Sequence, residues 1–492
     1  MPKTFRFQKF SAQTLPLLLT AYVVLQPFLD VLTSIAVNAG ISITAGTVVR
    51  TLFMAAAFLY ILFCGPFPGK RPILIYLGVL TGYLAVFFCY SLLKGGFSAC
   101  LTNVGESLKV FYFPYTAAFL YALYRQKRFI ISRKTVVTAA ACYCLIILLA
   151  FLTGTSFITY NSGYGYSGWF FAANDVSTIV MLSAPVIVCY SLERLTGRVN
   201  WRVGLGIALV LFSLIFSANF IGTKVVFAGV LLYLILAVIW LAVQFCKTRR
   251  RSVLRCCLLC LLLGVLLCGI YPFSPLNQYV NDIYVPMSDK ESPAYQQSIA
   301  IPGVVEKDRA KYNAKLEEAA EGTWLGELIH QNPLVDKLNW ILSKRLLIAA
   351  PVAQEFTDGG PGVKLLGLGY APMPGYTRDI SHLIEMEGTS LLLRHGIAGF
   401  LVYYVPYLGL IAYAVVQFFR RLKTRMGDFL YCSYFYSTLM AFAASLVAGH
   451  VLVSPAVSLF VAILYLHLTD ITLRQNRALA EGLPLPAEAQ PF

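Results

Sequence analysis

Repeated apolar runs constrain the fold of this 492-residue chain more than any other feature. A helix needs about 20 mainly apolar residues to cross the hydrocarbon core of a bilayer. The chain has about twelve runs of suitable length, so we predict an all-α polytopic membrane protein. The predicted spans are residues 15–37, 44–64, 73–93, 104–124, 136–152, 169–190, 203–218, 224–245, 253–271, 387–418, 429–448 and 452–468.

Composition and charge placement support the same class. Hydrophobic residues make up 58% of the chain and charged residues only 13%, which excludes an ordinary soluble globular protein. The net charge of +16 does not indicate nucleic acid binding, because Lys and Arg concentrate in short connections between alternate spans. That distribution is typical of cytoplasmic loops. We therefore expect both termini in the cytoplasm and a retained first helix, since no small-residue cleavage site follows the basic N-terminus.

The predicted spans divide the chain into four parts. Residues 1–271 hold nine transmembrane helices, and residues 387–470 hold three more. Between them, residues 272–386 form one large extracytoplasmic loop with short helices. Residues 471–492 are expected to be a cytoplasmic tail. A connection as long as this loop is usually functional.

One helix of the large loop can be predicted in detail. Asn332 followed by Pro333 is typical of a helix start, because Asn caps the free N–H groups and Pro fits the first turn. Apolar residues then recur at helical spacing at Leu334, Leu338 and Ile341, which favours a helix lying on the membrane or packed on the bundle. Continued at that spacing, Arg345 would lie on the same face. It either binds an anion there or reaches water along an apolar surface.

Several ionisable residues fall near the outer ends of predicted spans. A proton or ion pathway would distribute such costly groups across the membrane depth. Their gathering on one side instead favours an outward-facing site at the level of the lipid headgroups. Asp30 and Arg50 lie at comparable depths and either pair with each other or serve that site. The residues concerned are Asp30, Arg50, Glu106, Lys109, Asp175 and Lys224.

The stretch 364–404 passes from a Gly/Pro-rich loop through a titratable cluster into an apolar run. That cluster includes Arg378, His382, Glu385 and Glu387. The carboxylates either form a site or cap the helix where water meets lipid. In a site, Glu385 is the candidate general base, His382 is the rival base, and Glu387 supports them.

The cations Lys109, Lys224 and Arg345 suit a phosphate or diphosphate group, which they would stabilise as it leaves. The outer regions contain no Asp-x-Asp pair and no His/Cys cluster with metal-ligand spacing. We therefore expect neither a metal ion nor a cofactor. No internal repeat suggests the paired halves of a secondary transporter.

Four motifs occur in order around the large loop. Glu385-Met386-Glu387 precedes the glycine motif at 396–399 (GIAG), and Arg345 precedes the motif at 366–369 (LGLG). Earlier in the chain, residues 168–175 (GWFFAAND) include Asn174 and Asp175, and residues 222–224 (GTK) end in Lys224. Together these motifs resemble the bacterial O-antigen polymerase and O-antigen ligase superfamily. Ligases of this superfamily usually carry His at the position of Glu385, whereas a Glu there is more similar to the polysaccharide polymerases of Gram-positive type.

This resemblance implies a membrane glycosyltransferase with an architecture like that of the GT-C enzymes, in the bacterial cytoplasmic membrane. Its donor would be an oligosaccharide on undecaprenyl diphosphate, transferred with inversion and without a metal to another lipid-linked repeat unit. Arg345, Lys224 and Lys109 would hold the diphosphate, and Glu385 would activate the acceptor. Asn174, Asp175, Glu387 and Arg378 are further site candidates. Membrane lipids and proteins that set chain length or export the polymer are the implied partners.

Two other functions stay open on the sequence. A ligase would transfer the glycan to a different acceptor, using the same donor site. A lipid-linked oligosaccharide flippase would need a central charged cavity and has no need for a large outer loop bearing an Arg and an acid. A structure should bring Arg345, Lys224 and Glu385 to one cavity if the glycosyltransferase hypothesis is right.

Overall fold

The computed structural model describes residues 3–41, 43–127, 129–159, 164–197, 200–281, 316–372, 374–378, 380 and 384–483. Within these ranges, ten helices are long and apolar enough to cross a membrane. An eleventh span is formed if α1 and α2, which meet at a bend of 49°, count as one. The helices of membrane length are α3 (Ala45–Phe63), α4 (Lys70–Lys127), α5 (Arg133–Leu152), α6 (Ala173–Thr196), α7 (Trp201–Phe220), α8 (Lys224–Thr248), α9 (Arg251–Ile270), α17 (Glu387–Arg420), α19 (Phe429–Val447) and α20 (Pro455–Ala480), with α1 (Lys3–Val24) and α2 (Gln26–Asn38) as the bent pair.

Shorter elements connect these helices. β1 and β2 pair as an antiparallel ribbon between α5 and α6, with Phe157 opposite Gly168. Most of the other short elements belong to the large loop before α17. Among the described residues, the short elements in chain order are β1 (Phe157–Ile158), β2 (Tyr166–Gly168), η1 (Tyr271–Phe273), α10 (Pro275–Tyr279), α13 (Trp324–Gln331), α14 (Pro333–Ile341), α15 (Arg345–Asp358), α16 (Pro361–Leu366) and α18 (Leu422–Met426).

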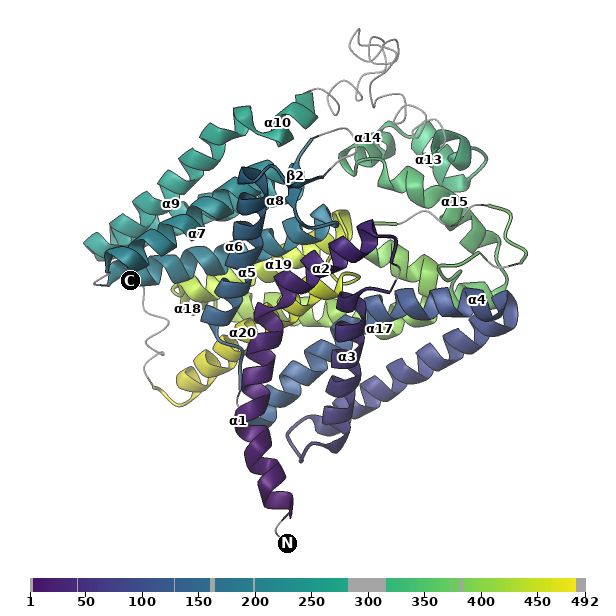
Figure 1. The fold of residues 1–492 in the computed structure, drawn as a ribbon, viewed down its shortest axis with the longest axis horizontal. Coiled ribbons are helices and arrows are strands. Elements are labelled where there is room, and N and C mark those ends of the chain that lie inside the picture. Colours follow the sequence, from purple (N-terminus) through teal and green to yellow (C-terminus); the bar gives the residue numbers. More distant parts are fainter. Residues whose placement is uncertain are drawn as a thin grey trace.

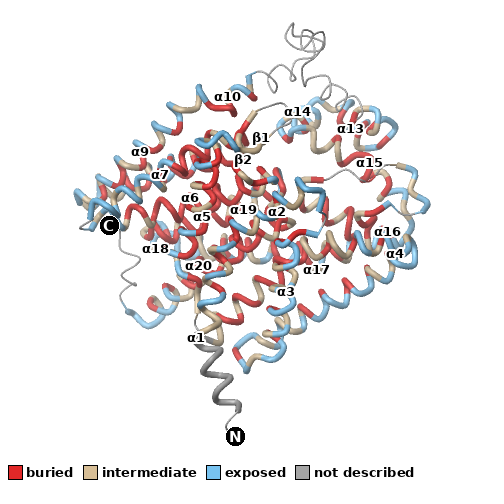
Figure 2. The backbone as a smooth tube through the Cα atoms, in the orientation of Figure 1, coloured by how far each residue is buried: buried red, intermediate tan, exposed pale blue. Residues whose placement is uncertain are grey.

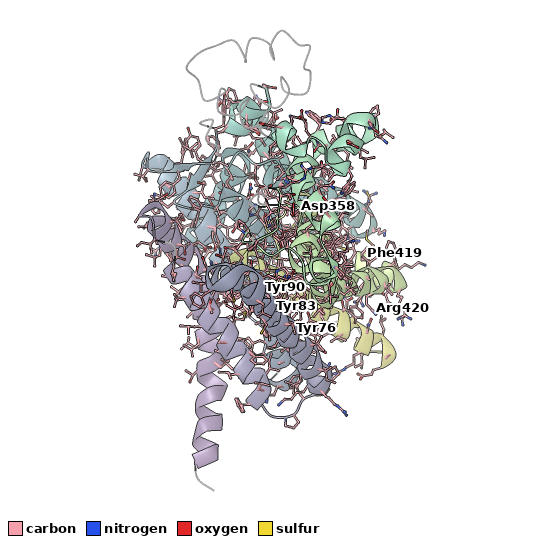
Figure 3. The ribbon with its side chains drawn as sticks, turned by 90° about the vertical axis from the view of Figure 1, so that its right-hand side faces the viewer. Tyr76, Tyr83, Tyr90, Asp358, Phe419 and Arg420 are labelled. Carbon is pink, nitrogen blue, oxygen red and sulfur yellow. The ribbon has the colours of Figure 1, made fainter. Side chains whose placement is uncertain are left out.

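The two spans predicted at 73–93 and 104–124 form α4, which folds back on itself (Figure 1). The backbone leaves the helical conformation at Gly96, where φ is 75° and ψ is −173°. The two arms then run side by side, because Asn103 Nδ2 donates to Ser91 Oγ at 3.0 Å. Along the first arm, Tyr76, Tyr83 and Tyr90 follow one another two turns apart (Figure 3).

The core of the bundle is built from α5, α6, α19 and α20, which pack against one another. Their residues are mostly buried, whereas α3, α7 and α9 expose one face (Figure 2). This is the arrangement expected when lipid covers the outer helices, because lipid tails are as apolar as the exposed Leu and Ile side chains. The predicted all-α class is therefore confirmed.

The short helices α13 to α16 gather at one end of the bundle, which we call the loop side (Figure 1). The opposite end, where α1 begins, is called the basal side. The N-termini of α6, α8, α17 and α20 face the loop side, because each follows a connection located there. Side chains at these four N-termini can therefore approach one another.

The predicted helix after Asn332 is present as α14, and its Asn332 cap accepts from the N–H groups of Leu334 and Val335 at 3.0 and 3.4 Å. The predicted position of Arg345 on the same helix face is wrong. α14 ends at Ile341, and Ser343 and Lys344 take positive φ values of 56° and 63°. Arg345 instead begins the separate helix α15. Leu334, Leu338 and Ile341 are exposed rather than packed on the bundle.

The two glycine motifs of the sequence meet each other. α17 breaks at Gly396, where φ is 65°, and the strand-like segment after α16 docks at this break. Leu368 N donates to Leu393 O at 3.0 Å, and Gly369 N donates to Arg394 O at 2.9 Å. A Cβ on Gly396 would lie 2.4 Å from the carbonyl oxygen of Leu365, so only Gly allows this approach. The contact fixes the large loop to the helix that begins at Glu387.

α20 continues beyond residue 470, where the sequence prediction began the tail. The helix ends at Ala480, ahead of Gly482 at φ 64°. The intervening residues are mostly good helix formers without Gly or Pro, so nothing in the sequence stops the helix earlier. Near the basal end, Arg474 pairs with Asp470 one turn before it, at 2.8 Å.

Candidate functional site

Glu385 lies on the loop side, two residues before α17. Its neighbours in sequence, Ile384 and Met386, are buried, which fixes the backbone on both sides of Glu385. Three charged side chains from other parts of the chain lie around this carboxylate. We call Arg345, Glu385, His450 and Asp175 the Glu385 cluster.

Arg345 supplies the first contact. Its Nε donates to Glu385 Oε2 at 2.6 Å, and a second guanidinium nitrogen also contacts this oxygen. Arg345 is the first residue of α15, and a cation at a helix N-terminus is disfavoured by the helix dipole. The ion pair with Glu385 offsets that cost. Both side chains are largely buried, with 18% and 25% of their surfaces exposed.

His450 supplies the second contact, from the connection between α19 and α20. Its Nε2 lies 3.7 Å from Glu385 Oε1, and its Nδ1 lies 2.8 Å from Asp175 Oδ1. Asp175 stands in the first turn of α6, and its other oxygen accepts from Ser454 Oγ at 2.6 Å. The imidazole therefore joins the carboxylates of two helix mouths that are far apart in sequence.

Glu387 holds this connection in place. Its Oε1 accepts from the backbone N–H groups of Val451, Leu452 and Val453 at 2.6, 2.8 and 3.1 Å. The connection also passes directly over the backbone of Glu385. A Cβ on Gly449 would lie 1.7 Å from the carbonyl oxygen of Glu385, and Gly449 has φ of 68°. Gly449 and Glu387 together bring His450 to the cluster.

The charges of the cluster determine its protonation. Burial raises the pKa of Glu385, but His450 and the Arg345 guanidinium outweigh it and hold that pKa below its ordinary value. Burial lowers the pKa of His450, but Asp175 and Glu385 outweigh burial and raise the pKa to about 10. At neutral pH Glu385 is therefore ionised and His450 is protonated, so the two side chains attract each other.

The other predicted site residues lie in different surroundings. Lys224 begins α8 on the loop side and is half-buried. Among the described residues, Glu385 forms ion pairs with Arg345 and His450. Lys109 pairs with Glu106 on α4 at 2.7 Å, and both are close to half exposed. The predicted meeting of Arg345 with Glu385 is confirmed, and that of Lys224 with them remains a prediction.

Two further candidates have local structural contacts. Asn174 accepts through its backbone oxygen from Ser177 and Thr178, both at 2.8 Å. Arg378 donates to the carbonyl oxygens of Glu321 and Gly322, so it braces the connection before α13 and does not join the Glu385 cluster. His382, the rival base, lies outside the described residues.

Asp30 and Arg50 pair with each other, at 2.5 Å between Oδ1 and a guanidinium nitrogen. Arg50 also donates to Gln26 Oε1, and Tyr143 donates its hydroxyl to Asp30 Oδ2 at 2.5 Å. These contacts join α2, α3 and α5. The pair has a structural role in the first helices of the bundle.

His450 is the functional candidate that sequence reasoning missed. It falls between the predicted spans 429–448 and 452–468, so it was not counted among the ionisable residues within spans. The available signal was a His at the loop-side mouth of a span, on the same side of the membrane as Glu385. Asp175 was predicted only as a lesser candidate, and the structure brings it into the cluster through His450.

The cluster can perform two kinds of chemistry. The Glu385 carboxylate is ionised at neutral pH and can accept a proton from a hydroxyl group. The guanidinium and the imidazolium can bind an anion such as a phosphate. Among the described residues, no group of three or more His, Cys, Asp or Glu side chains is placed to hold a metal ion.

Comparison with models of known protein families shows which family the chain belongs to. The family model described as "O-antigen ligase like membrane protein" matches residues 12–473, which include every member of the Glu385 cluster. The chain belongs to this family. As a member of the O-antigen ligase-like family, it is a multi-pass membrane protein with a glycosyltransferase-type activity in membrane glycan transfer or polymerisation. Searches of curated proteins and of solved structures found no match.

Proposed function

We propose that this protein polymerises lipid-linked oligosaccharide repeat units at the outer face of the bacterial cytoplasmic membrane. The loop side is the extracytoplasmic side in this proposal, and both termini are cytoplasmic. The donor is an oligosaccharide on undecaprenyl diphosphate, and the acceptor is a hydroxyl group of another lipid-linked unit. The observation that carries the proposal is the Glu385 cluster, in which the Glu385 carboxylate contacts two cations at the mouth of a membrane helix.

In the proposed reaction, the acceptor oxygen attacks the anomeric carbon of the donor sugar. The bond from that carbon to the diphosphate oxygen breaks, and undecaprenyl diphosphate leaves with the electron pair. Glu385 takes the proton from the acceptor hydroxyl. Attack from the face opposite the leaving group inverts the anomeric configuration, and the charge on the diphosphate is balanced by protein cations rather than by a metal ion.

Arg345 has two successive partners in this mechanism. In the structure it occupies Oε2 of Glu385, whereas Oε1 faces His450. A diphosphate carries more negative charge than a carboxylate and can bind a guanidinium through two oxygens, whereas Arg345 contacts one oxygen of Glu385 in the structure. Donor binding would therefore draw Arg345 to the diphosphate and free Oε2 for the acceptor hydroxyl. This exchange makes Glu385 an available base only when the donor is bound.

His450 and Asp175 position Glu385 in this proposal. The imidazolium keeps Oε1 in place while Oε2 reacts, and Asp175 fixes the orientation of the imidazole ring. Lys224 and Lys109 are proposed as further contacts of the diphosphate, and Asn174 as a contact of the sugar. Proteins that control chain length or export are proposed partners of the polymer product.

Reconstitution tests this proposal. Purified protein in liposomes is given the undecaprenyl-diphosphate repeat unit of its own pathway, with and without a chelator, and products are resolved by size. A ladder of lengthening products that survives the chelator, with inverted linkages by NMR, supports the proposal. A product that does not lengthen, or lipid translocation without a new glycosidic bond, contradicts it.

Transfer to a different acceptor is the second candidate function, because the matching family is described by ligase activity. The same reconstitution separates the two functions. A ligase adds a completed glycan once to a foreign acceptor, whereas a polymerase extends one lipid-linked chain with further repeat units.

A further inference from the structure

A cavity of about 550 Å³ lies between α4, α17 and α20, and no residue of the Glu385 cluster lines it. Its lining includes Tyr76 and Tyr121 from the two arms of α4, Tyr413 from α17, and Tyr465 from α20. Cavities of about 300–1,000 Å³ are typical of sites that bury a small organic ligand. Figure 3 shows Tyr76 at the basal end of the first α4 arm, whereas Asp358 of α15 lies on the loop side.

The length of this cavity matches one leaflet of a bilayer. Along α4 its lining runs from Phe113 to Arg125, and along α17 from Tyr403 to Tyr413. At 1.5 Å per residue these segments rise about 18 Å and about 15 Å. The hydrocarbon core of a bilayer is about 30 Å thick, so one leaflet contributes about 15 Å. The cavity therefore extends through one leaflet, on the basal side.

The chemistry of the walls changes at the basal end. Most of the lining is apolar or aromatic, and Arg125 lies one residue before the end of the membrane-length segment of α4. Its guanidinium carbon lies 5.9 Å from the centre of the Tyr121 ring, which holds the charge beside the opening. Arg125 is half-buried, and 39% of the Tyr413 surface is exposed, so lipid can reach both. An apolar slot with a cation at its membrane-surface end suits an amphiphile with an anionic head.

We propose that this cavity binds an acyl chain of an anionic phospholipid from the basal leaflet, with Arg125 on its headgroup phosphate. The length of the slot, its apolar walls and the position of its single lining Arg all fit this occupant. The site is distinct from the Glu385 cluster, because no residue of that cluster lines the slot, which follows α17 from Tyr403 to Tyr413, beyond the break at Gly396. The bound lipid joins α4, α17 and α20 at their basal ends. This inference does not depend on the proposed reaction.

The test compares lipids with identical chains and different heads. The full-length protein in detergent is titrated with phosphatidylglycerol, with phosphatidylcholine or with a polyprenyl phosphate, and its thermal unfolding midpoint is recorded. A ligand at a hundredfold excess over its Kd raises the midpoint of a chain of this size by about 2–3 °C. We expect this rise with phosphatidylglycerol and a much smaller one with phosphatidylcholine.

Variants locate the effect. Arg125→Gln should remove the preference for phosphatidylglycerol, and Ala117→Leu, which narrows the cavity, should weaken both phospholipids. Arg194→Gln is the matched control, because Arg194 lies 5.1 Å over the ring of Tyr190 near the basal end of α6 and does not line the cavity. Should Ala117→Leu fail to fold, Arg125→Gln alone decides the test. Equal responses of wild type and Arg125→Gln overturn the proposal, as does stabilisation by polyprenyl phosphate but not by phosphatidylglycerol.

Discussion

Replacing His450 with Gln should raise the pKa of Glu385 and move the acidic side of the pH–activity profile upward. His450 Nε2 lies 3.7 Å from Glu385 Oε1, and both side chains are mostly buried. An opposite charge at about 4–6 Å lowers a carboxyl pKa by about 1–3, which corresponds to about 1.4–4 kcal/mol. Gln is similar in size and still offers a hydrogen bond, but it removes this charge.

The assay is the initial rate of product formation in detergent between about pH 3.5 and 8, a range that brackets the ordinary Glu pKa of about 4.3. The pKa of Glu385 is lowered in the wild type, so its carboxylate stays ionised and its contribution is lost only below the usual pKa. The wild-type rate should therefore vary little above about pH 5.5 on its acidic side. In His450→Gln the acidic limb should lie about 1–3 pH units higher than in the wild type, because the base is then protonated at higher pH.

A matched control separates this effect from a general loss of histidine. His330→Gln removes an exposed imidazole of α13 that lies 3.5 Å from Glu317, and it should leave the profile unchanged. Restoring the rate of His450→Gln by raising the pH shows that the variant is folded. An acidic limb at the same pH in wild type and His450→Gln would refute the reasoning, because His450 would then exert no field on the catalytic base.

Three further predictions concern the surroundings of Glu385. Gly449→Ala should abolish most activity, because its Cβ would meet the Glu385 backbone. Gly482→Ala, whose Cβ would lie in open space at φ 64°, should cost only about 1–2 kcal/mol of stability. Unequal activities of the two variants at similar unfolding midpoints would verify this prediction. Glu387→Gln should lower the free energy of unfolding by about 2 kcal/mol, because it weakens three backbone hydrogen bonds. Amide hydrogen exchange over residues 451–453 should become faster, and unchanged exchange would count against this prediction. Arg345→Lys should lower kcat/KM about tenfold through a weaker grip on diphosphate, and a normal kcat/KM would argue that Arg345 serves only the fold.

Much of the fold could be predicted from the sequence, because a bilayer requires long apolar helices wherever the chain crosses it. The arrangement within the loop side was harder to predict. Arg345 was placed on the face of α14 because the apolar period continues past Ile341, but the positive φ values at Ser343 and Lys344 end that helix. Neither residue type normally takes this conformation, so the sequence carries no clear signal of the break.

The site was partly predictable for a related reason. Glu385 and Arg345 are costly residues beside a membrane helix, and such residues usually have a partner nearby. His450 approaches them from the connection between α19 and α20, through contacts of Gly449 with Glu385 and of Glu387 with the backbone after His450. These contacts join residues more than sixty positions apart, so local patterns in the sequence could not reveal them.

The most direct test of the central claim is the rate of glycosidic bond formation in a single turnover. Each protein is mixed in excess with a labelled lipid-linked repeat unit. The proteins compared are wild type, Glu385→Gln and the control Glu327→Gln, which alters an exposed carboxylate in the first turn of α13. If Glu385 is the general base, Glu385→Gln should still bind the donor and should form bonds about 10²–10⁴-fold more slowly, whereas Glu327→Gln should match wild type. Bond formation at the wild-type rate in Glu385→Gln would contradict the account.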